Sequence, residues 1–381
     1  MPPSDAAPGH VRGAGGYLTA DLDAVAANYR TLADRLGPAS ECGAVVKADA
    51  YGLGLEPVAR ALAAAGCRSF FVALTEEGVA LRACLPDAAI YIFNGVDAET
   101  AAETAARGLV PVLNHPGQIE TWTAEARARG APLPAMVQVE TGMTRLGLGA
   151  AEVEALAGDP GGVAGLSLHA VMSHLACADE PEHPQNAEQL RRFEEALEIL
   201  RPLGIARASL ANSSGVFLDA AYHFDLARPG AALYGINPRP GGPNPMAQVI
   251  TLQGKILQTR TIDTPSAVGY GATHRARRGD RIATIGIGYA DGFLRSLSNS
   301  ACATIGGIRV PVVGRVSMDL ITIDVTAVPA EATRPGALVD LIGPEHPVDE
   351  LAREAGTIGY EILTALGRRF ERRYLGGGAA S

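Results

Sequence analysis

Residues 44–54 read AVVKADAYGLG, an apolar run of strand length that ends in a lysine and continues into a glycine-rich turn. Lys47 stands at the end of this predicted strand, where two preceding valines partly remove its amine from water. Desolvation lowers the pKa of an amine and makes it a better nucleophile or Schiff-base former. A solvated lysine at a strand end is the simpler explanation. However, Tyr51 and the two glycines beside it favour a turn that approaches a phosphate closely.

The chain around this segment alternates between apolar runs and helical patterns, from Tyr17 to about Tyr234. The predicted strands cover residues 44–46, 69–74, 89–93, 109–113, 135–139, 165–171, 208–211 and 224–226. Before the first strand, apolar residues recur at helical spacing over 22–36. Eight alternations of strand and helix predict an α/β fold of the (β/α)8 TIM-barrel type, in which catalytic residues lie at the carboxyl ends of the strands.

The second half of the chain has a different pattern, which begins after the linker sequence NPRPGGPNP at residues 237–245. Short predicted strands follow at 249–257, 281–287, 301–305, 310–313, 320–325 and 337–342, with one predicted helix at 358–366. We therefore expect a flexible leader at 1–14, the barrel at 15–238, a mostly β C-terminal domain at 239–375 and a disordered tail at 376–381.

Composition limits the classes of function. The 381 residues are 47% hydrophobic and 19% charged, and the net charge of −9 is opposite to that of a nucleic-acid-binding protein. No apolar run approaches the roughly 18 residues of a membrane span, and the N-terminus lacks the apolar region of a signal peptide. The five cysteines show no CxxC or zinc-type spacing. We expect a cytoplasmic protein without a metal site and with no nucleic-acid or membrane partner.

Further motifs stand in order along the chain. They are ETGMTRLGL at 140–148, MSHLACADE at 172–180, NSSG at 212–215, RPGAALYG at 228–235, VGYGAT at 268–273, IGYADGF at 287–293, GRVSMD at 314–319 and IGYE at 358–361. Together with residues 44–54 they resemble, over nearly the whole chain, the alanine racemase family, whose enzymes use pyridoxal 5'-phosphate (PLP). Such an ordered series is far more specific than any single motif.

The resemblance implies a PLP-dependent racemase, an isomerase that interconverts L-alanine and D-alanine. It would supply D-alanine for the peptidoglycan of the cell wall or break down the opposite isomer. The resemblance also implies a homodimer in which each active site is shared between subunits. Lys47 matches the lysine that carries the cofactor and acts as one acid/base group, and Tyr270 matches the second, contributed by the other subunit. Racemisation removes the α-proton on one face and returns a proton on the other, so it requires a group on each face.

Other matches surround the cofactor. Arg228 matches the arginine that faces the pyridine nitrogen, where its permanent charge disfavours protonation of that nitrogen. His174 matches the histidine that packs beside the ring and supports this arginine. The phosphate contacts that the resemblance implies are Tyr51, Ser213, the backbone of Gly230 and Ala231, and Tyr360. Glycine-rich turns after the last barrel strands often bind phosphate in this fold.

A third group of matches concerns the substrate. Arg145 matches the arginine near the phenolic oxygen of the cofactor and the substrate carboxylate, which a planar guanidinium can bind bidentately. Met318 matches the backbone N–H donor to that carboxylate from the second subunit, and Asp319 is expected to orient the same loop. Tyr289 and Arg295 fall where the family narrows the entrance, which favours a small substrate.

The sequence departs from the family pattern at a few positions. Gln138 stands where many members have a carbamylated lysine that steadies the arginine matched by Arg145, so that modification is not expected here. An anion or another side chain would have to take its place. Glu140 replaces the more usual aspartate and Leu53 a frequent histidine, which affects the tuning of the site rather than the reaction.

Three alternatives remain open from the sequence. A racemase of broader or serine specificity on the same fold is disfavoured by Tyr289 and Arg295. An amino-acid decarboxylase of the same architecture is disfavoured because Arg228 stands where a glutamate would be expected. A noncatalytic cofactor-carrying protein built on the barrel alone would leave Tyr270 and Met318 without a role.

Overall fold

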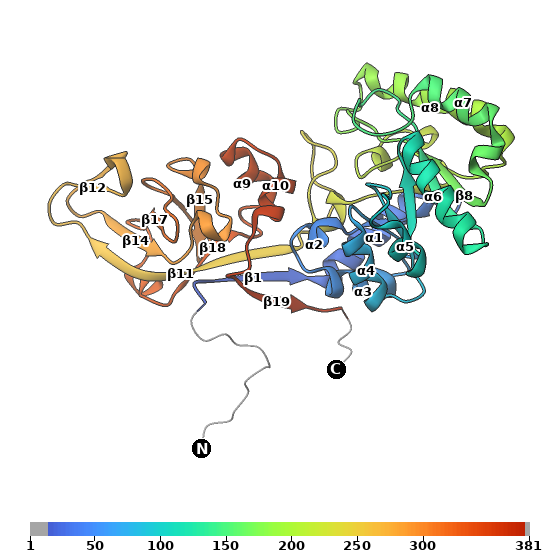
Figure 1. Cartoon of the computed structure of the whole chain (residues 1–381). Helices are drawn as coiled ribbons and strands as arrows, with labels where there is room; N and C mark the ends of the chain where they lie inside the picture. The colour runs from blue at the N-terminus through green and yellow to red at the C-terminus, as the bar shows by residue number, and fades with distance from the viewer. Residues whose placement is uncertain (1–13, 378–381) are drawn as a thin grey trace. The chain divides into compact units, whose positions relative to one another are not determined.

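The computed structural model describes residues 14–377 and divides into two compact units (Figure 1). One unit comprises residues 23–247, and the other joins the N-terminal segment up to residue 22 with residues from 248 onward. Apart from Ala14, Gly376 and Gly377, the predicted leader at 1–14 and the predicted tail at 376–381 lie outside the described residues.

The first unit is a barrel of parallel strands. A seven-stranded sheet runs in the order β3 (Ala44–Val45), β4 (Ser69–Val72), β5 (Ala89–Ile92), β6 (Val110–Leu113), β7 (Leu133–Gln138), β8 (Leu166–Met172) and β9 (Ala208–Ser209). The eighth strand, β10 (Leu226–Ala227), pairs in parallel with β2 (Glu41–Cys42), which directly precedes β3. The N–H of Asp225 donates to the carbonyl of Ala208, and the N–H of Arg228 to that of Ala211, so β10 also joins β9. These bonds close the ring and confirm the predicted barrel.

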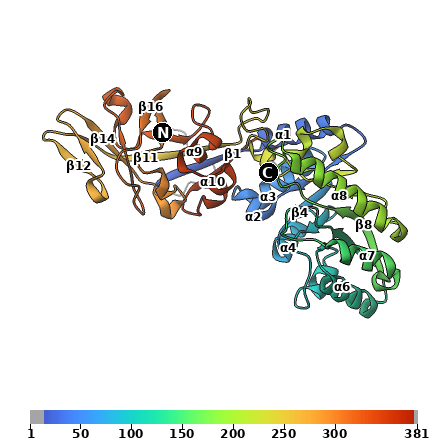
Figure 2. The same ribbon diagram turned by 90° about the horizontal axis from the view of Figure 1, so that it is seen from above.

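Helices follow the strands in the order that the sequence pattern predicts. They are α1 (Leu22–Leu36), α2 (Lys47–Tyr51), α3 (Leu55–Ala64), α4 (Thr75–Cys84), α5 (Ala101–Ala106), α6 (Pro116–Arg129), α7 (Ala150–Gly158) and α8 (Pro184–Leu200). Figures 1 and 2 show α4, α6, α7 and α8 on the outside of this unit. Val25 and Leu32 of α1 are completely buried, as its apolar spacing predicts. Strands β4 and β6 are buried at every position, which explains why their sequences are mostly apolar instead of alternating between apolar and polar residues.

The second unit is mostly sheet, as predicted. Its main strands are β1 (Gly16–Asp21), β11 (Ile250–Thr261), β14 (Arg281–Ile285), β15 (Cys302–Ile305), β16 (Ile308–Pro311), β17 (Ile321–Asp324), β18 (Leu338–Ile342) and β19 (Glu371–Leu375). The sheet runs β16-β15-β18-β11-β1-β19, and β14 pairs with both β11 and β17. A separate hairpin joins β12 (Ser266–Val268) to β13 (His274–Ala276), and two helices, α9 (Val348–Ala355) and α10 (Gly359–Ala365), complete the unit.

The unit division differs from the expected barrel bounds of 15–238. Residues 16–21 form β1, which pairs antiparallel with β11 and parallel with β19, both in the second unit. Alternate residues of β1 are buried, which suits a strand with one covered face better than a barrel strand. At the other boundary, the amide of Asn28 on α1 exchanges two hydrogen bonds with the backbone of Ala247, which keeps the linker with the barrel unit.

Among the helices of residues 14–377, none is both long and apolar enough to cross a membrane.

Candidate active site

The segment that carries Lys47 turns sharply at the carboxyl end of β3. Four consecutive non-glycine residues, Ala48 to Tyr51, have positive φ values between 53° and 56°. The segment α2 is therefore a left-handed turn. Each such residue costs roughly 1–2 kcal/mol, and the conformation persists only where surrounding contacts hold it. Three contacts are local: Gly52 N–H donates to Ala48 O, Gly54 N–H to Asp49 O, and Leu55 N–H to Asp49 Oδ1, at 2.7–2.9 Å. The strain is concentrated at the residues that follow the lysine.

Lys47 itself lies in a partly buried, mainly positive environment. Its Nζ is 5.9 Å from the centre of the Phe93 ring, beyond the end of β5. Burial lowers the pKa of Lys47, the charge of Arg145 lowers it further, and the carboxylate of Glu77 opposes both effects. A lysine with a lowered pKa has more of its amine in the neutral form, which is the form that acts as nucleophile or base.

Arg228 is a buried cation with an unused donor. One terminal nitrogen donates to Ser209 Oγ and the other to the carbonyl of Ser173 at 2.5 Å. Its Nε is buried and has no hydrogen-bond partner within the described part of the chain. Burial lowers the pKa of Arg228 to about 9, so the guanidinium is still charged at neutral pH. A charged N–H without an acceptor is costly in a protein interior, and the site therefore calls for an acceptor atom from a ligand.

His174, after β8, is neutral at physiological pH. Burial lowers its pKa to about 3, and the charges of Arg228, Arg145 and Lys47 lower it in the same direction. His174 therefore lies within electrostatic reach of all three cations, and Arg145 also lies within electrostatic reach of Lys47. The barrel thus brings together four of the predicted cofactor residues at the carboxyl ends of its strands.

The hydroxyl groups of Ser213 and Tyr51 lie close to the backbone turn at Gly230. Ser213 Oγ accepts hydrogen bonds from the N–H groups of Gly230 and Ala232, at 2.9 and 3.2 Å. Its own hydroxyl hydrogen is therefore left to donate to another acceptor. A Cβ at Gly230 would lie 2.4 Å from Tyr51 Oη, so only glycine lets the backbone and the phenol come together here. Ala231 begins the short helical turn Ala231–Tyr234 that follows Gly230.

The loop that carries Arg145 is held by an acidic side chain. The carboxylate of Glu140 accepts hydrogen bonds from the N–H groups of Gly142, Met143 and Thr144, the last two at 2.8 Å. Gln138, at the position where the family often has a modified lysine, donates from Nε2 to the carbonyl of Leu146 at 3.0 Å. Two backbone hydrogen bonds join the two ends of this loop: Glu140 N–H donates to Leu148 O, and Leu148 N–H donates to Gln138 O. Arg145 is exposed at its tip.

The remaining predicted site residues belong to the second unit. Tyr270 begins the turn Tyr270–Ala272 at the end of the β12–β13 hairpin and is 73% exposed. It lines a hollow of about 380 Å³ together with Arg315, Ser317 and Leu320. Arg295 begins the turn Arg295–Leu297 and is exposed, and the half-exposed Tyr360 lies in α10.

Tyr289 and Met318 lie on two loops that are bonded to each other. Tyr289 N–H donates to Ser317 O and Ala290 N–H to Met318 O, both at 3.0 Å. Both side chains are exposed, Tyr289 at 41% and Met318 at 54%. Asp319 follows on the second loop. The structure therefore places the predicted entrance tyrosine and the predicted carboxylate contact next to each other in one loop pair.

One arginine that the sequence analysis missed ties these loops together. The guanidinium of Arg369 binds both carboxylate oxygens of the buried Asp291, at 2.6 and 2.7 Å, and one oxygen of Asp319 at 2.8 Å. Asp291 also accepts from the N–H of Gly288 at 2.9 Å. In the sequence, Arg369 stands in the run RRFERR, which reads as a solvated charged segment and gives no signal of this role.

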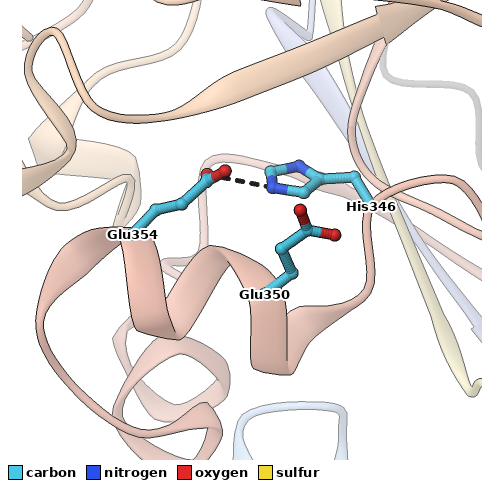
Figure 3. Close-up of side chains that lie close together, drawn as sticks. All are labelled: His346, Glu350 and Glu354. Atoms are coloured by element: carbon cyan, nitrogen blue, oxygen red, sulfur yellow. Dashed lines mark hydrogen bonds and ion pairs between the residues drawn. The ribbon is translucent and has the colours of Figure 1, made fainter.

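Among the described residues, one group has the donor atoms for a metal ion: His346, Glu350 and Glu354, on α9 and the turn before it (Figure 3). Arg309 of β16 already pairs with both carboxylates, at 2.6 Å from Glu350 and 2.8 Å from Glu354. The two ring nitrogens of His346 lie 3.0 Å from Glu354 Oε2 and from the carbonyl of Leu341. Because these partners occupy the donor atoms, the cluster acts as a brace between α9 and strands β16 and β18.

Two family models match the chain. The model of the alanine racemase N-terminal domain matches residues 20–238, and the model of the alanine racemase C-terminal domain matches residues 249–374. The chain is 53% identical over 369 residues to an alanine racemase of Rhodospirillum rubrum, which covers 97% of this chain and 98% of that protein. It is 52% identical over 367 residues to a catabolic alanine racemase of Mesorhizobium japonicum, covering 96% and 94%.

Solved structures agree with these matches. The alanine racemase of Bartonella henselae with covalently bound pyridoxal phosphate superposes with a TM-score of 0.90 at 41% identity, covering 95% of this chain and 100% of that one. The biosynthetic alanine racemase of Pseudomonas aeruginosa superposes with a TM-score of 0.88 at 35% identity, with the same coverage of 95% and 100%.

Proposed function

The chain belongs to the alanine racemase family, and on that premise we propose that it interconverts L-alanine and D-alanine with Lys47 and Tyr270 as its two acid/base groups. It is a PLP-dependent enzyme of the isomerase class. The observation that supports the site assignment best is the buried, unpartnered Nε of Arg228, near the neutral His174, which also lies within electrostatic reach of Lys47.

The residues of the barrel fit the cofactor. A charged N–H without a protein acceptor suits the pyridine nitrogen, which carries a lone pair. The Ser213 hydroxyl, the turn at Gly230 and Tyr51 would hold the phosphate, and Tyr360 is proposed as a further contact. The neutral imidazole of His174 can pack beside the ring without adding a second positive charge. When bound, PLP supplies an electron sink that stabilises negative charge at Cα of the substrate.

Lys47 and Tyr270 would each move a proton at that Cα. The lowered pKa of Lys47 leaves more of its Nζ in the neutral form that can accept the α-proton. Tyr270 Oη, on an exposed turn, would return a proton on the opposite face in one direction of the reaction and remove it in the other. We propose that Tyr270 reaches the site from a second copy of the chain in a homodimer.

Arg145 and Met318 would orient the substrate. The planar guanidinium of Arg145, on the loop braced by Glu140, suits bidentate binding of the alanine carboxylate. The backbone N–H of Met318 is proposed to add a further donor from the second subunit. Tyr289 and Arg295 would restrict the entrance and favour a small side chain.

The cellular role is also a proposal. D-alanine for the peptidoglycan of the cell wall is the proposed product, made in the cytoplasm without a nucleic-acid or membrane partner. The relatives include proteins named catabolic as well as one named biosynthetic, so degradation of the opposite isomer is the second candidate role.

Substrate range can be tested directly. PLP-loaded protein is incubated separately with L-alanine, D-alanine, L-serine and a large amino acid, and loss of optical activity is followed. We expect alanine to racemise much faster than the other substrates. Faster racemisation of serine or of the large amino acid would contradict the roles given to Tyr289 and Arg295, and release of carbon dioxide would point to a decarboxylase.

A further inference from the structure

One acidic side chain, Glu77 of α4, joins the segment that carries Lys47 to the end of the next barrel strand. Its Oε1 accepts from the N–H of Ala48 at 2.5 Å. Its Oε2 accepts from the N–H groups of Ala73 and Leu74, just after β4, at 2.8 and 3.2 Å. A single carboxylate therefore holds backbone groups from the ends of two adjacent strands.

The bond to Ala48 falls at the first residue of the left-handed turn. Ala48 has a φ of 53°, and the three residues after it also have positive φ. The hydrogen bonds from Gly52, Gly54 and Leu55 described above lie within residues 46–55, whereas Glu77 comes from a helix 29 positions further along the chain. Hydrogen bonds from backbone N–H groups to a carboxylate are charge-assisted and stronger than neutral ones. Glu77 is thus a tertiary contact that can offset part of the strain next to Lys47.

Glu77 also supplies the negative charge that acts on Lys47. The charged groups that act on the pKa of this lysine are Arg145 on the loop after β7 and Glu77 on α4, and the titratable His174 after β8 lies within electrostatic reach of it. The Phe93 ring faces the amine from the end of β5. Burial and Arg145 both disfavour the ammonium form, and the Glu77 carboxylate favours it. The charge state of Lys47 therefore depends on a residue that the proposed reaction does not use.

We propose that Glu77 is a positioning residue for Lys47: its carboxylate anchors the left-handed turn after the lysine to the end of β4 and balances the positive charge of Arg145 at the amine. This role rests on the proposed function only in that Lys47 is the residue that binds the cofactor. Glu77 touches no reacting atom and is not a catalytic residue.

The lysine content of the chain makes the proposal testable without measuring activity. Lys47 and Lys255 are the only two lysines in the sequence. Full-length protein labelled with ¹³C-lysine, freed of cofactor, would give two Cε signals whose pH titrations can be followed by NMR. Lys255, whose Nζ lies over the Tyr17 ring in the second unit, serves as the internal reference.

Three variants separate charge from hydrogen bonding. Glu77→Gln removes the charge, Glu77→Asp keeps the charge but shortens the reach to Ala48, and Glu76→Gln is the control at the exposed neighbouring carboxylate. In Glu77→Gln we expect the Lys47 signal to titrate at lower pH than in the parent protein, with Lys255 unchanged. In Glu76→Gln both signals should titrate as in the parent. In Glu77→Asp the Lys47 midpoint should stay closer to the parent value.

Cofactor capture and turnover give the second readout. Borohydride trapping of PLP on Lys47, measured by mass spectrometry, reports the lysine independently of racemisation. We expect kcat of both Glu77 variants to fall by about tenfold or more, because small displacements of a reacting group cost up to about a hundredfold in rate. Glu76→Gln should keep the parent kcat.

The outcomes are distinct. An unchanged Lys47 midpoint in folded Glu77→Gln, or an equal shift in Glu76→Gln, overturns the proposal. If Glu77→Gln does not fold, Glu77→Asp decides, and parent kcat in that variant also overturns it. A parent protein that binds PLP on Lys47 but leaves alanine unracemised refutes the proposed function, whereas the shift in Glu77→Gln would still support the positioning role.

Discussion

At the scale of single residues, burial and charge act together on the barrel groups. Lys47 loses hydration and faces Arg145, so two effects lower its pKa while one carboxylate opposes them. His174 experiences the same surroundings more strongly and is neutral. Arg228 remains charged because its pKa starts far above neutrality. Burial thus lowers the pKa of all three residue types, and because their ordinary pKa values differ, His174 is neutral while Arg228 stays charged.

The Lys47→Ala variant tests the covalent role of the lysine. Lys47 is the only lysine in the sequence of the barrel unit, residues 23–247. We therefore expect the purified variant to lose the absorption of bound cofactor at ~420 nm. An absorption spectrum of the variant incubated with PLP and then desalted measures this. Retention of the band at the parent intensity would remove Lys47 from its assigned role.

The Tyr270→Phe variant tests the two-base assignment. Loss of the phenolic hydroxyl should leave the cofactor band in place but slow turnover from one enantiomer of alanine more than from the other. Initial rates and α-deuterium exchange in D₂O, measured from L-alanine and from D-alanine, report the asymmetry. Equal parent-level behaviour from both isomers would exclude Tyr270 as an acid/base group.

His174 should make stability fall in acid. Its pKa is lowered from the ordinary 6.5 to about 3 in the folded chain, so the unfolded chain binds more protons between these values. Above about pH 6.5 the imidazole is neutral in both the folded and the unfolded chain, and its titration does not reduce stability. As the pH falls toward 3, the unfolded chain takes up the proton first, so the free energy of unfolding decreases. Allowing for its partial exposure, we expect about 1–2 kcal/mol less stability at pH 5 than at pH 7.5 from this residue.

Denaturant unfolding of the parent and of His174→Asn, in the same cofactor state, isolates this effect. Asparagine does not titrate, so the variant should lose less stability than the parent between pH 7.5 and pH 5. Identical losses in the two proteins would mean that His174 does not carry the stated pKa.

At the scale of elements, turns rather than helices position the predicted groups. Lys47 and Tyr51 bound a left-handed turn, Arg145 lies on a loop held by Glu140, and Tyr270 lies in a hairpin turn. Family motifs located these residues along the chain. Two further contacts come from residues distant in sequence: Glu77 binds the turn after Lys47, and Arg369 ties the loops of Tyr289 and Met318. No local pattern identifies such partners.

The loop pair that carries Tyr289 and Met318 should depend on Arg369. Arg369→Gln removes the bidentate pairing with the buried Asp291 and the bond to Asp319. We expect a lower melting temperature and a KM for alanine raised about tenfold, with a smaller change in kcat, because the loops are proposed to contact the substrate rather than the reacting atoms. Arg368→Gln, at the exposed neighbouring arginine, is the matched control. A KM unchanged from the parent would show that the loops hold their positions without Arg369.

At the scale of the whole molecule, the barrel was predictable and the second unit only partly so. Barrel strands such as β4 and β6 are buried at every position, and helices separate the strands, so eight short apolar runs sufficed to place them. Strands β1 and β19 pair with each other although they come from opposite ends of the chain, and sequence patterns carry no information about such partners. The β12–β13 hairpin escaped prediction because only the Val268 and Ala276 ends of its strands are buried, so neither strand forms an apolar run.

The candidate site shows the same division. Among the barrel residues predicted from motifs, Lys47, Arg145 and Arg228 all act electrostatically on His174, and Arg145 also acts on Lys47. The unpartnered Nε of Arg228 and its bonds to Ser209 and Ser173 depend on three-dimensional packing and had no counterpart in the sequence analysis. Family resemblance thus predicts the reacting groups, and the structure adds the neighbours that influence the pKa of Lys47 and His174.

The most direct test of the proposed racemisation follows the circular dichroism of alanine from both directions. PLP-loaded protein is added to pure L-alanine in one cell and to pure D-alanine in another, with Lys47→Ala protein in matched cells. We expect both parent signals to decay to zero, since the two enantiomers have equal free energy in water, and the Lys47→Ala cells to keep their signals. A parent signal that persists from either enantiomer, in protein shown to contain PLP, would contradict the assignment.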